Sequence, residues 1–424
     1  MVVKLNHNKL DPKEAWYSKV RVVEARTDIG SMFYLVDENY NFIEFTKEFL
    51  DMISSRSNNS VSPNTLKSYC YDLRYFIIFL NIKNLSVLSL DGRPDILVDY
   101  KLWLKNPFRF YENVYLLSNY STYNYKKYDL KDSTINQYID RVSSLYLWLK
   151  ATNKIKENPV IYRNIIATSS MRDRDLLTHT RHNRKIQINS LKSKPPKVLP
   201  KTIDQNLFTK FLNNLNLLRD KIILLCLKEG GFRASELLGI HLEDIDFAEQ
   251  GLWVRFRPNN SNLARAKSGY GKDRFVNLST DLMALIDTYI STEWIESNPN
   301  NDFLFVVVKS NVFNINGKAM TKSTLDSMFR YYSMKTFGYT IVNGDKIPKY
   351  NLHPHMLRHT HATELAREYI RKGESVNWKF ISMRLGHSSI TTTIEIYSHL
   401  KIEDYKKEYY RLHINKNSKN NDLF

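Results

Sequence analysis

The residues best suited to chemistry in this sequence are two arginines, two histidines and one tyrosine, all in its second half. Phosphoryl transfer needs a nucleophile, a proton donor for the leaving oxygen, and cations around the non-bridging oxygens. A tyrosine hydroxyl can attack phosphorus, and the planar, permanently charged guanidinium of arginine can donate two parallel hydrogen bonds to a phosphate. The set is therefore suited to binding and attacking a phosphodiester. Its members are Arg233, His355, Arg358, His387 and Tyr397.

The spacing within the set supports convergence on one phosphate. Arg233 lies in Gly231-Phe232-Arg233-Ala234-Ser235-Glu236-Leu237. Taken alone, it is most simply a surface arginine paired with Glu236 one helical turn away. That interpretation weakens once the downstream residues are considered, because His355 and Arg358 are three residues apart and emerge from the same face of a helix.

A lysine is expected where the leaving oxygen must be protonated, and one polar loop supplies two. Lys267 lies in Ala264-Arg265-Ala266-Lys267-Ser268-Gly269, and Lys272 follows five residues later. A flexible loop could deliver either one. Tyr397 lies ten residues beyond His387, and this context distinguishes it among 27 tyrosines, most of which are expected to be packing residues.

Four histidines cluster between residues 353 and 361, which raises the alternative of a metal site. His355 and His359 have the i, i+4 spacing of helical ligands, but no glutamate follows His355 as in metalloprotease helices, and no cysteine pair lies nearby. A helix with some buried histidines is the simpler interpretation. We therefore predict that these histidines hold no metal.

Composition indicates a polyanionic partner. The chain has 424 residues, 62 Lys+Arg against 44 Asp+Glu, and a formal net charge of +18, which favours nucleic acid or an acidic membrane surface. Its apolar runs are far shorter than the ~20 residues of a membrane span, and the N-terminus has no apolar signal core, so we expect a cytoplasmic protein. Cys70 and Cys226 fall in apolar helical patterns and predict buried free thiols.

Two domains are expected from this length. Residues 1–45 form a lead-in segment of unassigned role. Polar caps and apolar residues at three- and four-residue spacing predict helices over 65–80 and 132–149, in a helical domain spanning 46–170. Residues 171–202 form a basic linker, which is either a solvated connector or, as we favour, a strap across a phosphate backbone. Residues 203–400 form the second domain, and 401–424 a tail.

The second domain is predicted to be mainly helical around a small antiparallel sheet. Alternating residues predict strands at 253–256 and 274–278, joined by a hairpin loop over 259–272, and a third strand at 303–308. The predicted helices cover 208–215, 218–229, 321–335, 355–370 and 376–385, and a last helix follows Tyr397.

Residues 203–400 resemble the catalytic domain of tyrosine recombinases, the phage integrase family. That family's pattern is an arginine in a Gly-x-Arg-x-Ser-Glu-Leu turn, a β-hairpin lysine, His-x-x-Arg, Leu-Gly-His, and a tyrosine nine or ten residues later. Residues 46–165 resemble the family's helical core-binding domain, which binds DNA. The matching positions are Arg233, Lys267, His355, Arg358, His387 and Tyr397.

The resemblance implies a site-specific DNA recombinase that needs neither metal nor nucleotide. Tyr397 would attack a DNA phosphate to give a 3′-phosphotyrosine and a free 5′-hydroxyl. Arg233, Arg358 and His387 would stabilise charge on the phosphate. Lys267, which the resemblance favours over Lys272, would protonate the leaving oxygen, and His355 would assist proton transfer at the tyrosine.

The resemblance also implies an assembly. Two domains would close around double-stranded DNA, and four protomers would assemble on two recombination sites, with accessory proteins as possible partners and no membrane involved. The amphipathic tail over 401–412 could pack on a neighbouring protomer. Two alternatives share parts of the pattern: a type IB topoisomerase, which would relax DNA without joining two sites, and a DNA-binding protein without catalytic activity.

Overall fold

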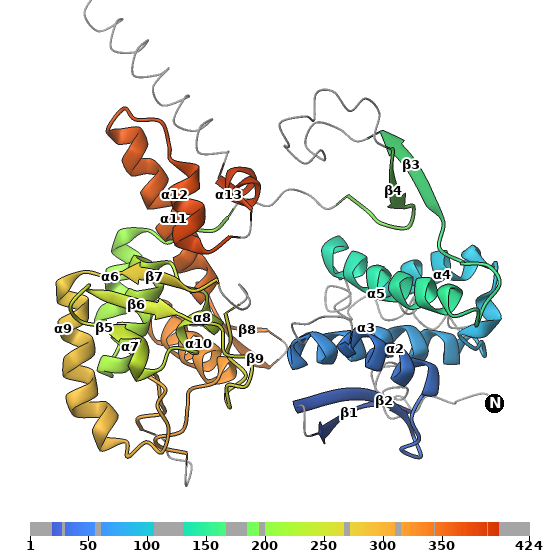
Figure 1. The fold of residues 1–424 in the computed structure, drawn as a ribbon, viewed down its shortest axis with the longest axis horizontal. Helices are drawn as coiled ribbons and strands as arrows, with labels where there is room; N and C mark the ends of the chain where they lie inside the picture. Colours follow the sequence, from blue (N-terminus) through green and yellow to red (C-terminus); the bar gives the residue numbers. More distant parts are fainter. Residues whose placement is uncertain are drawn as a thin grey trace, which may run out of the picture. The chain divides into compact units, whose positions relative to one another are not determined.

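The computed structural model divides into two compact units, Met1–Lys197 and Val198–Phe424. Figure 1 shows their helices and strands. Both units combine helices with small antiparallel sheets, which confirms the predicted fold class. The structure describes residues 19–27, 30–55, 61–105, 130–166, 185–194, 200–266, 272–309, 315–342, 344–387 and 389–397.

The described part of the first unit contains four α-helices. They are α2 (Glu44–Ser55), α3 (Pro63–Ile82), α4 (Pro94–Lys105) and α5 (Asp132–Ala151), with a short 3₁₀ turn at Leu88–Leu90. The predicted helices over 65–80 and 132–149 are thus present. Ser62 caps α3 by accepting a hydrogen bond from the Thr65 amide, which satisfies one of the donors left open in the first turn.

A β-hairpin precedes these helices, so part of the predicted lead-in segment is structured. Strands β1 (Val20–Thr27) and β2 (Gly30–Asp37) pair in antiparallel fashion. β2 packs against α3, and the consecutive residues Met32 to Val36 are all buried, which shows that both faces of this strand are covered. The hairpin therefore belongs to the core of the first unit.

The end of the first unit differs from the extended linker predicted for 171–202. Strand β3 (Tyr162–Ile166) pairs with β4 (Lys185–Asn189), and Asn136 of α5 makes two hydrogen bonds with the backbone of Ser193. Part of the predicted linker is thus attached to the helices of the first unit. The division into a DNA-binding domain, a linker and a catalytic domain remains a prediction.

The second unit begins with two helices and a sheet. Helix α6 (Gln205–Asn213) precedes α7 (Leu218–Leu225), which continues into a π-helical turn, Cys226–Gly230, and the short α8 (Ala234–Leu237). A 3₁₀ turn (Leu242–Asp244) leads to the sheet of β5 (Ile245–Asp246), β6 (Gly251–Val254) and β7 (Arg274–Asn277). The β6–β7 pair is the predicted hairpin.

The strand predicted at 303–308 is wrong. This apolar run is buried, but it makes only two isolated bridges, His241 with Phe303 and Val306 with Ala319. Its backbone groups form hydrogen bonds with loop segments instead. For example, the Leu304 amide donates to the Ile240 carbonyl at 2.9 Å. A short buried apolar run cannot be identified as a strand by periodicity alone.

The remaining described elements of the second unit are five helices, a π-helical turn and a second hairpin. Figure 1 shows α11, α12 and α13, in orange and red, gathered at one end of the unit. The helix predicted after Tyr397 lies outside the described residues, and the last described helix instead ends on that tyrosine. The elements are α9 (Thr280–Tyr289), a π-helical turn (Ile290–Trp294), α10 (Lys322–Phe337), β8 (Tyr339–Val342), β9 (Asp345–Pro348), α11 (Pro354–Arg371), α12 (Trp378–Leu385) and α13 (Ile390–Tyr397).

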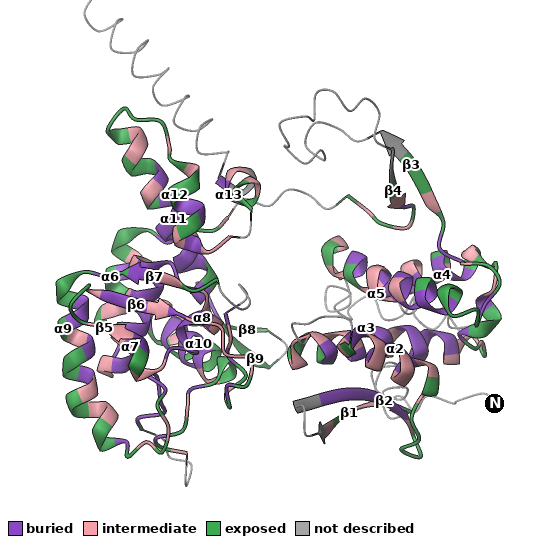
Figure 2. Ribbon diagram, in the orientation of Figure 1, coloured by how far each residue is buried: buried purple, intermediate pink, exposed green. Residues whose placement is uncertain are grey.

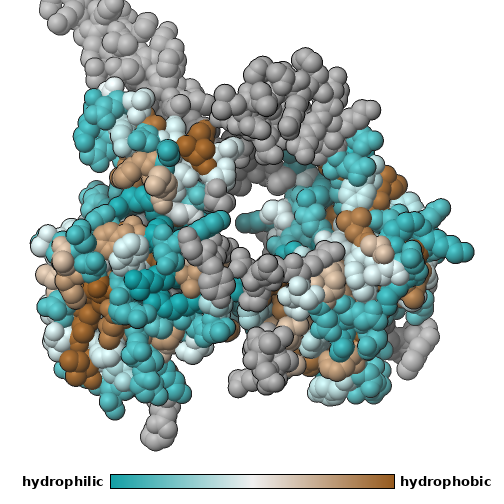
Figure 3. All heavy atoms as spheres, in the orientation of Figure 1, coloured by the Kyte–Doolittle hydropathy of each residue, from teal (hydrophilic) through white to brown (hydrophobic). Residues whose placement is uncertain are grey.

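Each unit has its own hydrophobic core. One cluster lies entirely in the first unit, and a second, between Ile203 and Leu357, lies in the second unit. Figure 2 shows the buried residues on the inward faces of the helices, and Figure 3 shows a largely hydrophilic surface on the visible face of both units. Cys70 and Cys226 are buried free thiols, as predicted. Among the described helices, none is long and apolar enough to cross a membrane.

Candidate active site

Arg233 is positioned by the turn that ends the π-helical segment. Gly231 takes a left-handed conformation with φ of 64°, and Arg233 then becomes the N-cap residue of α8. Glu236 fixes this arrangement, because its carboxylate accepts from the Arg233 amide at 2.8 Å and from the Arg233 guanidinium at 2.6 Å. The pairing expected from sequence is therefore present, but it lies in a partly buried site and not on an open surface.

Arg358 extends from α11 into the same region and is 2% exposed. Its Nη1 donates to the Gly231 carbonyl at 2.6 Å, and its Nη2 donates to the Leu385 carbonyl at the end of α12. Burial, with a further contribution from the nearby Arg233 charge, lowers the pKa of Arg358 to about 9. The guanidinium therefore remains charged at neutral pH.

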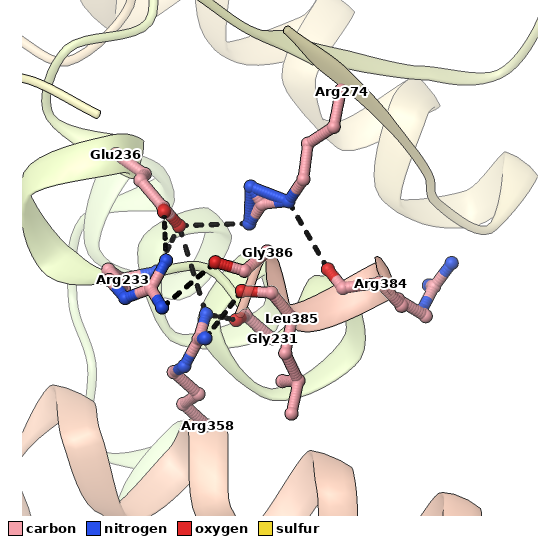
Figure 4. Close-up of polar contacts among 8 residues, drawn as sticks. All are labelled: Gly231, Arg233, Glu236, Arg274, Arg358, Arg384, Leu385 and Gly386. Carbon is pink, nitrogen blue, oxygen red and sulfur yellow. Dashed lines mark hydrogen bonds and ion pairs between the residues drawn. The ribbon is translucent and has the colours of Figure 1, made fainter. Parts of the chain in front are cut away.

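A third arginine, Arg274 on β7, completes a cluster around Glu236 that the sequence analysis did not identify. Figure 4 shows three guanidinium groups converging on this single carboxylate. Arg274 Nη2 lies 2.9 Å from Glu236 Oε2, and Arg358 Nη1 lies 3.8 Å from the same oxygen. Burial lowers the pKa of Arg274 as well. The only sequence signal for such a cluster was the glutamate three residues after Arg233, and its burial is known only from the structure.

The cluster carries an excess of positive charge. Three guanidinium groups surround one carboxylate, and uncompensated buried charge is energetically costly. Among the described residues, the Arg233 guanidinium donates to Glu236 and to the Gly386 carbonyl, which uses two of its five N–H donors. The arrangement is therefore suited to an anion that supplies both charge and acceptor oxygens.

His387 follows α12 directly. Gly386, with φ of 63°, ends that helix, and the His387 Nδ1 lies 2.7 Å from the Thr393 hydroxyl on α13. Burial is the largest cause that lowers the pKa of His387, to about 4, and the charges of Arg358 and Arg233 act in the same direction. Both guanidinium groups are thus within electrostatic range of this neutral imidazole.

Tyr397 is the last residue of α13, and its ring is buried in a small apolar cluster between α11, α12 and α13. Its hydroxyl lies 2.7 Å from Nδ1 of His359, the residue after Arg358. Burial raises the pKa of Tyr397, and the positive charge of Arg358 opposes that rise. Tyr397 therefore lies in the field of the same arginine that anchors the cluster.

His355 lies one helical turn before His359 on α11 and is exposed. Their rings are 4.4 Å apart between centroids in an edge-to-face arrangement. The sequence analysis assigned proton transfer at the tyrosine to His355 and considered His359 only as a possible metal ligand. The structure places His359 at the tyrosine hydroxyl, and no sequence spacing could distinguish these two residues on one helix face.

The predicted general acid, Lys267, lies outside the described residues. Lys272, the alternative, is described and exposed, just before β7. Within the described parts of the chain, no three or more His, Cys, Asp or Glu side chains gather in a way that could hold a metal ion.

The sequence was compared with protein-family models and with known proteins. Residues 201–404 match the model of the phage integrase family. Transposase A from transposon Tn554 of Staphylococcus aureus is 29% identical over 392 residues, covering 92% of this chain and 97% of that protein. Tyrosine recombinase XerC of Staphylococcus carnosus is 24% identical, covering 83% and 92%.

A solved structure supports the fold. The Tn1549 transposon integrase in complex with transposon right end DNA superposes with a TM-score of 0.52 at 19% identity, covering 86% of this chain and 98% of that one. At this identity the likeness concerns the fold alone. Residues 201–404 are therefore a phage integrase family domain, and the relatives that match most of the chain are a transposase and a tyrosine recombinase.

Proposed function

We propose that this protein is a site-specific DNA recombinase that cuts and rejoins DNA through a 3′-phosphotyrosine intermediate, for integration, excision or transposition. The observation that carries the proposal is the convergence of Arg233, Arg358 and Tyr397 from three separate elements. A tyrosine beside a positively charged anion site has what a phosphodiester cleavage requires without a metal.

The residues divide into two groups by role. Arg233 and Arg358 bind the non-bridging oxygens and stabilise the charge that grows on them in the transition state, and the neutral imidazole of His387 contributes a hydrogen bond. Tyr397 attacks phosphorus, and Lys267 protonates the leaving 5′-oxygen. The bond energy is conserved in the phosphotyrosine, so that a second 5′-hydroxyl can reverse the step.

The partner is double-stranded DNA, and a homotetramer on two recombination sites is the proposed working assembly, with accessory proteins as further partners. The net charge of +18 supports a polyanion, and the solved structures of the Tn1549 transposon integrase, which shares this fold, are complexes with DNA. We place the reaction in the cytoplasm. The tail over 401–412 is proposed to contact a neighbouring protomer.

The two alternatives are less well supported. A type IB topoisomerase would not need to join two sites, whereas the related proteins are a transposase and recombinases. A non-catalytic DNA-binding protein would not need a buried tyrosine in the field of Arg358.

The test begins with a binding site selected from genomic fragments that flank the gene. A nicked duplex carrying that site is incubated with wild-type protein and with Tyr397→Phe, and covalent adducts are detected on denaturing gels. We expect an adduct with wild-type protein only and equal DNA binding by both proteins. Binding without any adduct from wild-type protein would contradict the proposal. Joining of two such sites, and not relaxation of a site-free plasmid, then identifies a recombinase.

A further inference from the structure

We propose that His359 is a further catalytic residue, which accepts the proton of the Tyr397 hydroxyl during cleavage and returns it to the tyrosine oxygen during rejoining. This inference rests on the proposed function of Tyr397 as the nucleophile. It assigns the proton transfer to a residue that the sequence pattern did not single out.

The geometry meets the first requirement for a general base. His359 Nδ1 lies 2.7 Å from the Tyr397 oxygen, within the 2.6 to 3.2 Å that direct proton transfer requires. Their ring centroids are 5.9 Å apart at 63°, so the imidazole approaches the tyrosine edge-on and directs a nitrogen at the hydroxyl. His359 is fixed on α11 next to Arg358, so the base and the phosphate-binding cation move together.

The charges around His359 keep it neutral in the resting protein. It faces His355, Arg358 and His353 from its own helix, Tyr397 from α13, and His387 from the loop after α12. Burial, followed by the effects of His355 and Arg358, lowers the pKa of His359 to about 4. A neutral imidazole has one ring nitrogen without a proton, which is the state that a base requires.

DNA binding would make this base stronger. A phosphate next to Arg358 offsets part of the positive charge that disfavours the imidazolium, which raises the pKa of His359. At the same time, a bond forming between the tyrosine oxygen and phosphorus withdraws electrons from that oxygen and makes its proton more acidic. Proton transfer is therefore coupled to the attack and does not precede it.

Cleavage is one substitution at phosphorus, in which one bond forms and one bond breaks. The Tyr397 oxygen forms a bond to phosphorus, its proton moves to His359 Nδ1, and the bond between phosphorus and the 5′-oxygen breaks. The leaving oxygen receives its own proton from the separate acid, Lys267 in the proposed function. In rejoining, a 5′-hydroxyl attacks, and the imidazolium of His359 returns its proton to the departing tyrosine oxygen.

Asparagine is the variant that separates proton transfer from positioning. The side-chain amide of His359→Asn occupies the place of Nδ1 and can still hydrogen-bond to Tyr397, but it cannot accept a proton. His355→Asn is the matched control one helical turn away, on the same helix face and in ring contact with His359. Urea denaturation and binding of the selected duplex establish that both variants are folded and bind DNA.

The readout is the single-turnover rate of adduct formation on the nicked duplex between pH 4 and 9, because the pKa of His359 is about 4 in the free protein and rises when DNA binds. We expect His359→Asn to bind DNA within twofold of wild type and to cleave 10²- to 10⁴-fold more slowly, the range of a lost general base. The wild-type rate should fall at acid pH as His359 becomes protonated, and this inflection should be absent in His359→Asn. His355→Asn should keep the inflection.

The outcomes are distinct. A His359→Asn protein that cleaves within threefold of wild type, or that is slower but keeps the wild-type pH profile, overturns the inference and leaves Tyr397 as the proposed nucleophile. The inference is also overturned if the inflection is lost in His355→Asn and kept in His359→Asn, because the base would then be His355. Wild-type protein that binds the duplex and forms no adduct at any pH overturns the inference together with the proposed function.

Discussion

At the scale of single residues, Glu236 is the counterion on which the arginine cluster depends. It is 3% exposed and bonded to Arg233 and Arg274. Glu236→Gln keeps the shape of the side chain but leaves the buried guanidinium of Arg358 and the partly buried guanidinium groups of Arg233 and Arg274 without a negative charge. We expect a loss of about 3 kcal/mol in the free energy of unfolding. Millimolar inorganic phosphate should recover part of this loss, because it can occupy the anion site of the native state.

Asp220→Asn is the control for this prediction. Asp220 is also buried and pairs with Arg219 at 2.6 Å, but it lies in α7, outside the cluster. Urea denaturation of both variants, with and without phosphate, should show loss of stability in both and recovery in Glu236→Gln alone. Equal recovery would indicate general stabilisation by salt and would count against an anion site at the cluster.

At the scale of elements, two left-handed glycines hold the segments that carry the site. Gly231 ends the π-helical turn and presents its carbonyl to Arg358, and Gly386 ends α12 and presents its carbonyl to Arg233. An added Cβ at Gly231 would lie 2.5 Å from the His361 ring on α11. The end of the turn and the helix that carries Arg358 therefore fit together only without a side chain.

Gly231→Ala should accordingly be both unstable and poorly active. Gly373→Ala is the matched control, because Gly373 has φ of 73° with no atom within 4 Å of an added Cβ. The control should lose about 1–2 kcal/mol, the cost of the left-handed conformation alone. Gly231→Ala should lose more, and its adduct formation should fall much further than that of Gly373→Ala. Equal losses in stability and activity would show that contact with His361 is unimportant.

The elements also show what sequence could predict. Periodic apolar residues and a polar cap were sufficient for α3, because both signals are local. The strand prediction for 303–308 failed because the backbone of this segment pairs with loops, and the position of those loops depends on the folded chain. The contact between His359 and Tyr397 joins residues 38 apart, and only the placement of α13 against α11 determines which histidine meets the tyrosine.

At the scale of the whole molecule, the division into two units has a direct consequence. The main core of the second unit is built from residues 203 to 357, and its smaller cluster from α11, α12 and α13. Among the described residues, both clusters are built from the second unit alone. A fragment beginning at Val198 therefore contains its own cores, and we expect it to fold and to unfold cooperatively in urea, with the helical circular dichroism of a native domain.

The same fragment tests the DNA-binding role that the sequence predicts for the first unit. Each phosphate contact with Lys or Arg releases counterions, so the logarithm of the binding constant falls with the logarithm of salt concentration at a slope set by the number of contacts. If both units contact DNA, the fragment should bind the selected duplex more weakly and with a shallower slope than the full chain. A folded fragment with the same slope would show that the first unit makes no phosphate contacts, and its helices would then need another role.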